Sequence, residues 1–454
     1  MQTLDGPFPA YRGFAPHVPV HCVTPGGGGY IHRYYDSSPF SPSGRYLALT
    51  RLPFEDRLPE PGDVAEIVVV DLETGETRVV ADTRGWDVQL GAQLQWGADD
   101  RTLLFNDLDT RDWVPFGVRL DPGSGVARRL GGTVYSVSSD GRWAASPCLR
   151  RMAVTQRGYG VVVPRRCIPE SRGAPVDDGI WLTDLDSGDS RLLVSIAQIV
   201  EQAGPAPGAV RGRRGDWFGF HVKWNPQGTG LMFVLRWLPR SWLPWKRKKR
   251  HGAKQVVTMD ANGGDVRVAV TAERWARGGH HPNWCPDGEH VLMNLNTQGD
   301  GLRFARLPRD GSGCETLVPT LRGSGHPTLH PDGRHLLTDA YVTEPVAFGD
   351  GTAPIRLVDL GAGTDTTLVR IRTRPEAERT TGALRVDPHP AWDRAYGRIA
   401  FNACPEGIRQ VFVADLREEL ARRDPGAGSA RQAAGLPVAP QGADAPLRYL
   451  HHEP

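Results

Sequence analysis

The sequence of 454 residues lacks the features that mark several common classes of protein. It has no apolar run near 20 residues and no apolar segment of the signal-peptide kind near its start, so we expect a cytoplasmic protein without a membrane span. Formal charges nearly cancel, at net +2, whereas nucleic-acid binding requires a strongly basic surface. We therefore expect no membrane span and no nucleic acid as a partner.

Motifs that carry well-known chemistry are also missing. The six cysteines are scattered without any CxxC spacing, which argues against a zinc module and favours small buried side chains. There is no Ser-His-Asp elbow, no glycine loop that leads into a helix to cradle phosphate, and no His-Glu-x-x-His helix. The chain thus has no standard hydrolase, nucleotide-binding or zinc-peptidase signature.

A short turn recurs seven times instead, and a short apolar run follows each copy. The copies are SPSGR at 41–45, GADDR at 97–101, SSDGR at 138–142, NPQGT at 225–229, CPDGE at 285–289, HPDGR at 330–334 and DRAYGR at 393–398. Between successive copies lies a second apolar triplet that ends in another turn, as in VVVDLETG at 68–75. Asp-Gly and Ser-Gly pairs supply the positive φ of tight hairpins, so each period predicts strand, turn, strand, turn.

A repeat built only of short strands predicts a β-propeller, in which each repeat is a four-stranded blade. Seven copies predict an all-β, seven-bladed β-propeller over residues 17–418, with an N-terminal segment at 1–16 and a disordered C-terminal tail at 419–454. The copies are unequally spaced, which predicts two long insertion loops, at 143–180 and 229–256. We expect the first insertion to cover one mouth of the propeller.

Five of the seven blades place a histidine shortly before the turn. They are His32, His221, His281, His326 and His389. Equivalent positions of successive blades converge on the central channel, so these side chains should lie together. One interpretation is a structural residue that hydrogen-bonds the neighbouring blade; the other is a ring of imidazoles that binds a metal or transfers protons.

Asp387 and His389 are two residues apart on an extended segment, which places both side chains on one face. Together with His281 they would form a three-ligand metal site. Imidazole and carboxylate suit a divalent ion such as Mn²⁺ or Zn²⁺, and the lack of a thiolate argues against a soft-metal site.

Three segments resemble the oligogalacturonate lyases and related β-propeller polysaccharide lyases. They are HRYYDSSPFSPSG at 32–44, HHPNWCPDG at 280–288, and DPHPAW at 387–392 followed by GIRQVFVADL at 407–416. The resemblance implies a Mn²⁺ site with His281 and His389 as ligands. Asp387 replaces the first histidine of the family's His-Pro-His-Pro segment, and Leu384 stands where a glutamine ligand is expected, which implies a substrate other than oligogalacturonate.

The chemistry that the resemblance implies is β-elimination on a uronic acid. The metal or Arg33 would neutralise the carboxylate, a histidine would remove the C5 proton, and a tyrosine would protonate the leaving oxygen. The candidate catalytic residues are His32, Arg33, Tyr34, His221 and His326. The candidate substrate-binding residues are Tyr35, Gln93, Tyr159 and Asp216, the last of which could instead only orient His221.

Several alternatives stay open at this point. Arg33 can serve as an inter-blade salt bridge, and strand alternation would send Tyr34 and Tyr35 to opposite sides, with one of them in the core. The basic, tryptophan-rich segment 237–254 is either a β-hairpin with a solvated tip or a surface for an acidic polymer. An acidic-oligosaccharide lyase leads; a non-catalytic propeller that binds a glycan or protein, and a hydrolase or isomerase, are the alternatives.

Overall fold

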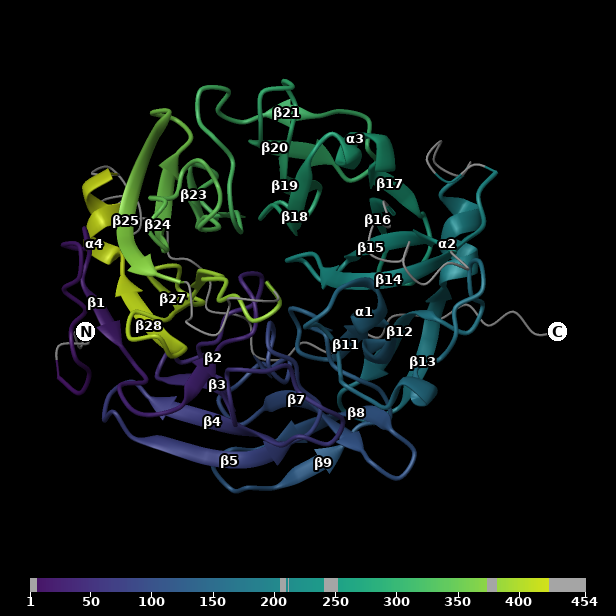
Figure 1. Ribbon diagram of the computed structural model, residues 1–454, viewed down its shortest axis with the longest axis horizontal. Helices are drawn as coiled ribbons and strands as arrows, with labels where there is room; N and C mark the ends of the chain where they lie inside the picture. Colours follow the sequence, from purple (N-terminus) through teal and green to yellow (C-terminus); the bar gives the residue numbers. More distant parts are fainter. Residues whose placement is uncertain (1–5, 205–209, 211, 241–251, 374–381, 424–454) are drawn as a thin grey trace, which may run out of the picture. The chain divides into compact units, whose positions relative to one another are not determined.

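The computed structural model describes residues 6–204, 210, 212–240, 252–373 and 382–423. The chain divides into two compact units, Met1–Asp415 and Leu416–Pro454. The first unit contains seven four-stranded antiparallel sheets arranged around a centre, and in six of them the first strand in sequence lies innermost (Figure 1). This confirms the all-β, seven-bladed β-propeller.

The first three blades take their strands in sequence order. Blade one consists of β2 (Gly29–Ile31), β3 (Tyr46–Leu52), β4 (Ala65–Asp71) and β5 (Thr77–Thr83). Blade two consists of β6 (Gln95–Trp96), β7 (Leu103–Asp109), β8 (Val114–Leu120) and β9 (Ala127–Arg129). Blade three consists of β10 (Ser136–Val137), β11 (Trp143–Ser146), β12 (Gly179–Asp184) and β13 (Ser190–Ser195).

The next three blades follow the same order. Blade four consists of β14 (Gly215–Trp224), β15 (Gly230–Pro239), β16 (Ala253–Asp260) and β17 (Arg267–Val270). Blade five consists of β18 (Gly279–Trp284), β19 (His290–Leu295), β20 (Arg303–Pro308) and β21 (Glu315–Thr316). Blade six consists of β22 (Thr328–Leu329), β23 (His335–Thr338), β24 (Thr352–Asp359) and β25 (Thr364–Arg372).

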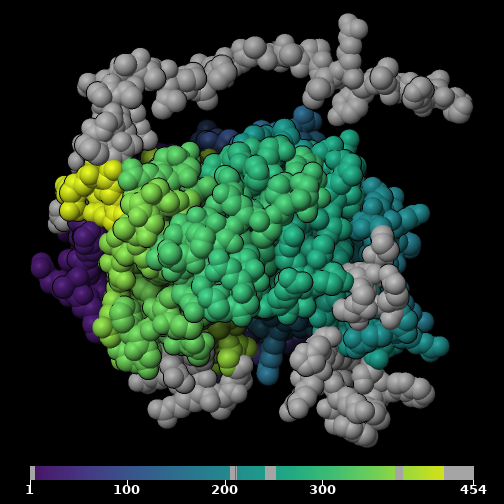
Figure 2. Space-filling model, turned by 90° about the horizontal axis from the view of Figure 1, so that it is seen from above, coloured from purple at the N-terminus to yellow at the C-terminus, as the bar shows by residue number. Residues whose placement is uncertain are grey.

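Blade seven closes the ring with a strand from the other end of the first unit. It consists of β26 (Ala391–Trp392), β27 (Arg398–Ala403), β28 (Gln410–Asp415) and, outermost, β1 (Val20–Cys22). β1 pairs antiparallel with β28, so the purple N-terminal segment borders the late blades in both views (Figures 1 and 2). This pairing covers an edge that would otherwise expose unpaired backbone groups.

Burial on both faces explains why each turn is followed by a continuous apolar run. A propeller sheet lies between two neighbouring sheets, so its middle strands are covered on both sides, as in β24, which is buried along its whole length. One apolar cluster, for example, joins Ile67 and Val69 of blade one to Leu103 and Phe105 of blade two. Packing between blades is therefore the main source of the core.

Both predicted insertions connect the second and third strands of a blade. The first contains helix α1 (Leu149–Thr155) and the 3₁₀ turn η1 (Arg165–Cys167). The second is a hairpin whose pairing runs from Gly230↔Asp260 to Trp237↔Ala253; its tip, 241–251, lies outside the described residues. Because neighbouring strands are antiparallel, both insertions lie at the end of the propeller where the inner strands begin.

Few helices accompany the strands. Helices α2 (Ile196–Gln202) and α3 (Ala272–Ala276) follow outer strands, and α4 (Arg417–Arg423) belongs to the second unit. The predicted tail begins within α4, and 424–454 lie outside the described residues. Within the described part of the chain, no helix has the length and apolar character needed to cross a membrane.

Candidate functional site

The structure brings the five predicted histidines together where the inner strands begin. The His281 and His326 rings stack with centroids 3.9 Å apart, and His326 lies 4.3 Å from His389. His32 lies 6.5 Å from His389, and His221 joins the group through Tyr34. All but His281 are under 9 % exposed. We call these five residues the histidine cluster.

Unusual backbone geometry holds part of this cluster. His281 and His389 have φ of 60° and 49°, in the left-handed region that normally favours glycine, and Gln93 of blade two has φ of 62°. β18 also has a register shift between His280 and Asn283. As a result His280 and His281 do not alternate as expected, and their ring centroids lie 4.4 Å apart. Backbone strain of this kind is concentrated at functional sites.

Tyr34 and Tyr35 both lie among the histidines. β2 ends at Ile31, so strand alternation does not apply to these tyrosines, and the prediction that they point to opposite sides is wrong: both rings belong to one buried cluster, with centroids 4.5 Å apart. The Tyr34 ring lies 5.3 Å from His221 and 4.6 Å from His389, while Tyr35 lies 5.0 Å from His326. Burial raises the pKa of both phenols well above the usual value, so both stay protonated.

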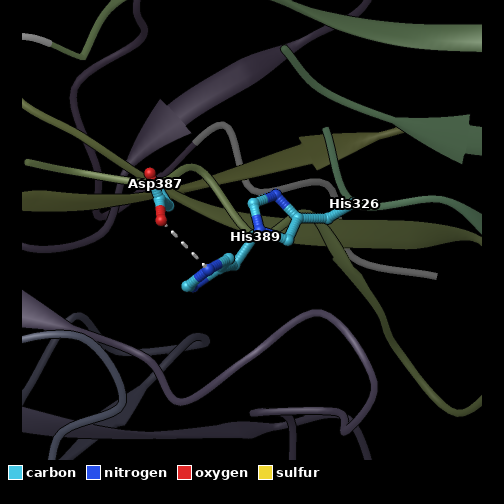
Figure 3. A group of neighbouring side chains, drawn as sticks. All are labelled: His326, Asp387 and His389. Carbon is cyan, nitrogen blue, oxygen red and sulfur yellow. Dashed lines mark ion pairs between the residues drawn. The ribbon is translucent and has the colours of Figure 1, made fainter. Parts of the chain in front are cut away.

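His326, Asp387 and His389 form the candidate metal centre (Figure 3). One ligand atom from each lies within 4.8 Å of the others. The Nδ1 atom of His326 is 2.9 Å from Oδ1 of Asp339, which leaves its Nε2 without a hydrogen-bond partner among the described residues. Both ring nitrogens of His389 are also without one.

These residues fit a divalent cation. A buried imidazole nitrogen without a partner is costly, and a metal ion would satisfy it. A histidine that binds metal usually donates its other ring N–H to a carboxylate, as His326 can do to Asp339. The imidazole and carboxylate donors suit Mn²⁺ or Zn²⁺.

The set differs in one member from the one predicted. Asp387 and His389 are common to both, whereas His326 stands in place of His281. Nδ1 of His281 meets the carbonyl oxygen of Gly325, and its Nε2 is 3.1 Å from the Tyr341 hydroxyl, so both nitrogens are already bonded. Leu384 is packed in an apolar cluster.

Arg33 is held by its neighbours within the propeller. Its Nη1 is 2.7 Å from Asp36 and 2.8 Å from Ser37, and its Nε donates to Oε1 of Gln93 over 3.1 Å. Nη2 donates to the carbonyl of Tyr135 in blade three. Arg33 thus forms its salt bridge within its own segment, with Asp36, and reaches the neighbouring blades through hydrogen bonds to Gln93 and Tyr135.

Arg385 is a cation near the cluster that the sequence interpretation missed. Its Nε lies 3.1 and 3.0 Å from the two carboxylate oxygens of Asp387, and Nη2 is 3.1 Å from the Tyr159 hydroxyl. Its side chain remains 24 % exposed. The signal was present in the sequence, because Arg385, Asp387 and His389 alternate along one extended segment.

The first insertion reaches the cluster through Tyr159. The Tyr159 ring lies 6.3 Å from His221, and the next residue, Gly160, donates its N–H to Asp87 over 2.8 Å. Burial raises the pKa of Tyr159 to about 12. Burial also raises the pKa of Asp87 to about 7. This effect is larger than the opposite effect of the backbone N–H groups that donate to its carboxylate and favour the charged form.

Asp216 occupies a different environment. It lies at the start of β14, where its carboxylate accepts from the N–H of Gly173 and pairs with Arg240. His221 is instead hydrogen-bonded at Nδ1 to the Tyr135 hydroxyl. Burial lowers the pKa of His221 well below the usual value and that of His32 to about 4, so both rings are neutral at pH 7.

Lys223 of blade four and Asp36 of blade one form a buried ion pair near the histidine cluster. Nζ of Lys223 is 3.0 Å from Asp36, 3.2 Å from the Tyr35 hydroxyl and 2.8 Å from the carbonyl of Pro282. Burial lowers the pKa of Lys223 to about 8. Burial would raise the pKa of Asp36, but Lys223 and Arg33 outweigh it and the pKa is lowered.

Comparison with known proteins adds evidence on the fold. No protein-family model and no curated protein matches the chain. The chain is similar to a solved oligogalacturonate lyase in complex with manganese, with 16 % identity over 91 % of this chain and 97 % of that one, at a TM-score of 0.61. It is also similar to the oligogalacturonate lyase of Vibrio parahaemolyticus, with 13 % identity over the same shares and a TM-score of 0.58. At these identities the likeness shows a related propeller fold.

Proposed function

We propose that the protein is a lyase that cleaves an acidic, uronic-acid-containing oligosaccharide by β-elimination. The observation that carries this proposal is the meeting of His326, Asp387 and His389 with buried tyrosine hydroxyls and imidazole nitrogens that lack partners. The similarity in fold to oligogalacturonate lyases, one of them with manganese, supports the same assignment. The replacement of two expected ligands by Asp387 and Leu384 favours a uronic-acid substrate other than oligogalacturonate.

His326, Asp387 and His389 would hold the ion, with Mn²⁺ as the leading candidate. The ion would supply a Lewis acid for the substrate carboxylate, which makes the neighbouring C5 proton more acidic. Arg385 would orient Asp387, since it contacts both carboxylate oxygens. Asp339 would hold the proton of His326 on Nδ1 and leave Nε2 as the donor atom.

Among the three candidate bases, hydrogen bonding favours His32. His326 belongs to the metal set, and Nδ1 of His221 is taken by Tyr135. The ring nitrogens of His32 have no side-chain hydrogen-bond partner among the described residues, and only the backbone of Pro388 and His389 interacts with them. His32 would therefore accept the C5 proton of the substrate.

Tyr34 is the best candidate for the acid that protonates the leaving oxygen. Its ring lies between His221 and His389, beside the candidate metal centre. The hydroxyl of Tyr35, in contrast, already accepts from Lys223 and faces the carbonyl of Pro282 at 3.2 Å. Tyr35 and Tyr159 would instead line the binding site.

The test is an assay of the purified protein on a panel of uronic-acid oligosaccharides, with Mn²⁺ and with a chelator. An elimination yields an unsaturated product with strong ultraviolet absorbance. We expect activity that the chelator abolishes and that His389→Ala and His32→Ala lose. His290→Gln changes a histidine in an outlying turn, where it pairs with Asp287, and should retain activity.

Two results would contradict the proposal. The first is no product from any member of the panel together with no metal by elemental analysis. The second is binding of an oligosaccharide without turnover, which would favour a non-catalytic glycan-binding propeller.

A further inference from the structure

A second cavity occupies the other mouth of the central channel. Its volume is about 280 Å³, and all seven inner strands or the turns after them contribute to its lining. The histidine cluster lies where these strands begin, whereas this cavity lies where they end. Arg33, Asp36 and Lys223 line the cavity and are joined by ion pairs, and Tyr35, whose ring lies 5.0 Å from His326, lines it too, whereas none of the five clustered histidines does.

The turn of blade seven carries an unusual residue at the rim of this cavity. In five blades the fourth residue of the turn is a glycine. Its backbone N–H donates to the carbonyl oxygen of the first residue of the turn. These glycines are Gly44, Gly141, Gly228, Gly288 and Gly333, with φ between 69° and 75°. In blade seven the same bond runs from Tyr396 to Asp393, and Tyr396 has φ of 56°.

A bulky side chain in this conformation is strained, since the left-handed region crowds Cβ against the backbone. Glycine would form the turn without that cost, as it does in five of the other six blades. The Tyr396 side chain is also 38 % exposed, although its ring lies 6.1 Å from Trp392 and 5.4 Å from His330. A strained, exposed aromatic residue at the rim of a cavity indicates a binding role.

The charges of the lining favour an anion. Arg33, Lys223 and Arg394 face two acidic residues, Asp36 and Asp393. Asp393 is already paired with Arg398, and Asp36 with the two inner cations.

Arg394 is the cation that remains available. Its Nη2 donates to the carbonyls of Trp96 and Gly97, and it forms no salt bridge with any residue that the structure describes. Arg394 is an exposed residue, and its Nε and Nη1, which lie on different edges of the guanidinium, can each donate one charge-assisted hydrogen bond to a carboxylate.

The remaining lining combines indole rings with small polar groups. Trp224, Trp284 and Trp392 supply apolar walls, and Ser136 and Asn283 supply hydrogen-bonding groups. The volume is slightly below the range of pockets for drug-sized ligands, so it suits a molecule of monosaccharide size. Aromatic walls match the C–H faces of a sugar, and the polar groups match its hydroxyls.

We propose that this cavity binds a small hydroxylated carboxylate, the size of one sugar acid. The sugar ring stacks on Tyr396, and the carboxylate bonds to Arg394. The site uses none of the five clustered histidines, so it does not depend on the chemistry proposed for them.

The experiment measures binding of D-galacturonate by calorimetry, with D-galactose as the uncharged comparison. We expect the wild type to bind galacturonate in preference to galactose. Tyr396→Gly should weaken binding about tenfold, and Tyr396→Phe should keep it, because the stacking ring is retained. Arg394→Gln should abolish the preference for the acid, and His389→Ala should leave this binding unchanged.

Thermal unfolding of each variant checks that it is folded. Equal affinity in Tyr396→Gly and wild type would overturn the proposal, as would the absence of galacturonate binding to the wild type. Loss of binding in His389→Ala alone would place the ligand at the histidine cluster and would also overturn it.

Discussion

Asp339→Asn tests how the candidate metal centre is built. Oδ1 of Asp339 lies 2.6 Å from the backbone nitrogen of His326 and 2.9 Å from its Nδ1, and Oδ2 lies 3.0 Å from the same Nδ1. The carboxylate therefore orients the ring and fixes the Nδ1 proton, which leaves Nε2 as the donor atom. Asparagine keeps the size of the side chain and one carbonyl oxygen but loses the negative charge.

The expected loss follows from the behaviour of carboxylates that support metal-binding histidines. Their replacement typically costs about tenfold to a hundredfold in metal affinity, which corresponds to about 1.4–2.8 kcal/mol. The measurement is Mn²⁺ binding by calorimetry to protein freed of metal, and it needs no substrate. We expect weaker Mn²⁺ binding in Asp339→Asn, with the protein still folded by circular dichroism.

Asp332→Asn is the matched control. Asp332 also accepts from histidines in the same blade, at 2.9 Å from His330 and 2.7 Å from His335, but it lies in the turn and not at the cluster. This variant should bind Mn²⁺ as the wild type does. Equal Mn²⁺ affinity in Asp339→Asn and wild type would refute the support of His326 by Asp339, and equal losses in both variants would point to a general effect on the fold.

Three further outcomes are expected. Removal of the chain up to residue 23 should lower the free energy of unfolding by about 3–6 kcal/mol and promote aggregation, because it exposes β28 and removes buried Val20 and Val23; unchanged denaturant unfolding would contradict this. The pKa of Lys223 is lowered from 10.5 to about 8, so between these pH values the folded state binds fewer protons than the unfolded state. The free energy of unfolding should therefore rise with pH in this range, by at most about 3 kcal/mol more than in Lys223→Met, in which Asp36 still pairs with Arg33. Parallel profiles of stability against pH in the two proteins would show that Lys223 has no such shift. Asp216→Ala should retain activity and lose less than about 1 kcal/mol of stability, since its ion pair with Arg240 lies near the surface. A lower kcat in this variant would instead support the prediction that Asp216 belongs to the substrate-binding site.

The sequence was sufficient to predict the fold because the repeat depends on local chemistry. Gly residues at the turns and the apolar runs after them specify hairpins without reference to the rest of the chain, and seven periods of strands have one common architecture. The repeat also aligned the five histidines, since equivalent positions in a propeller face one channel. The closing strand β1 gave no such signal, because three residues outside the repeat look like any other extended segment.

The details of the site were decided by tertiary structure. Whether His281 or His326 has a ring nitrogen available depends on Gly325, Tyr341 and Asp339, which come from a different stretch of chain than His281. The positive φ of His281 redirects its side chain in a way that strand periodicity does not predict. Two of the partners of Arg33, Gln93 and Tyr135, likewise come from other blades.

The amino-acid sequence by itself thus determined the seven blades and the gathering of histidines at one mouth of the channel. Only the tertiary structure decided which of these histidines keep nitrogens for a ligand, because hydrogen bonds between blades use up the others. The same holds for the second cavity. The sequence of the seventh turn contains Gly397, and only the hydrogen bond from Tyr396 to Asp393 shows that Tyr396 takes the position of the turn glycine, with its ring beside Trp392 in the lining of the cavity.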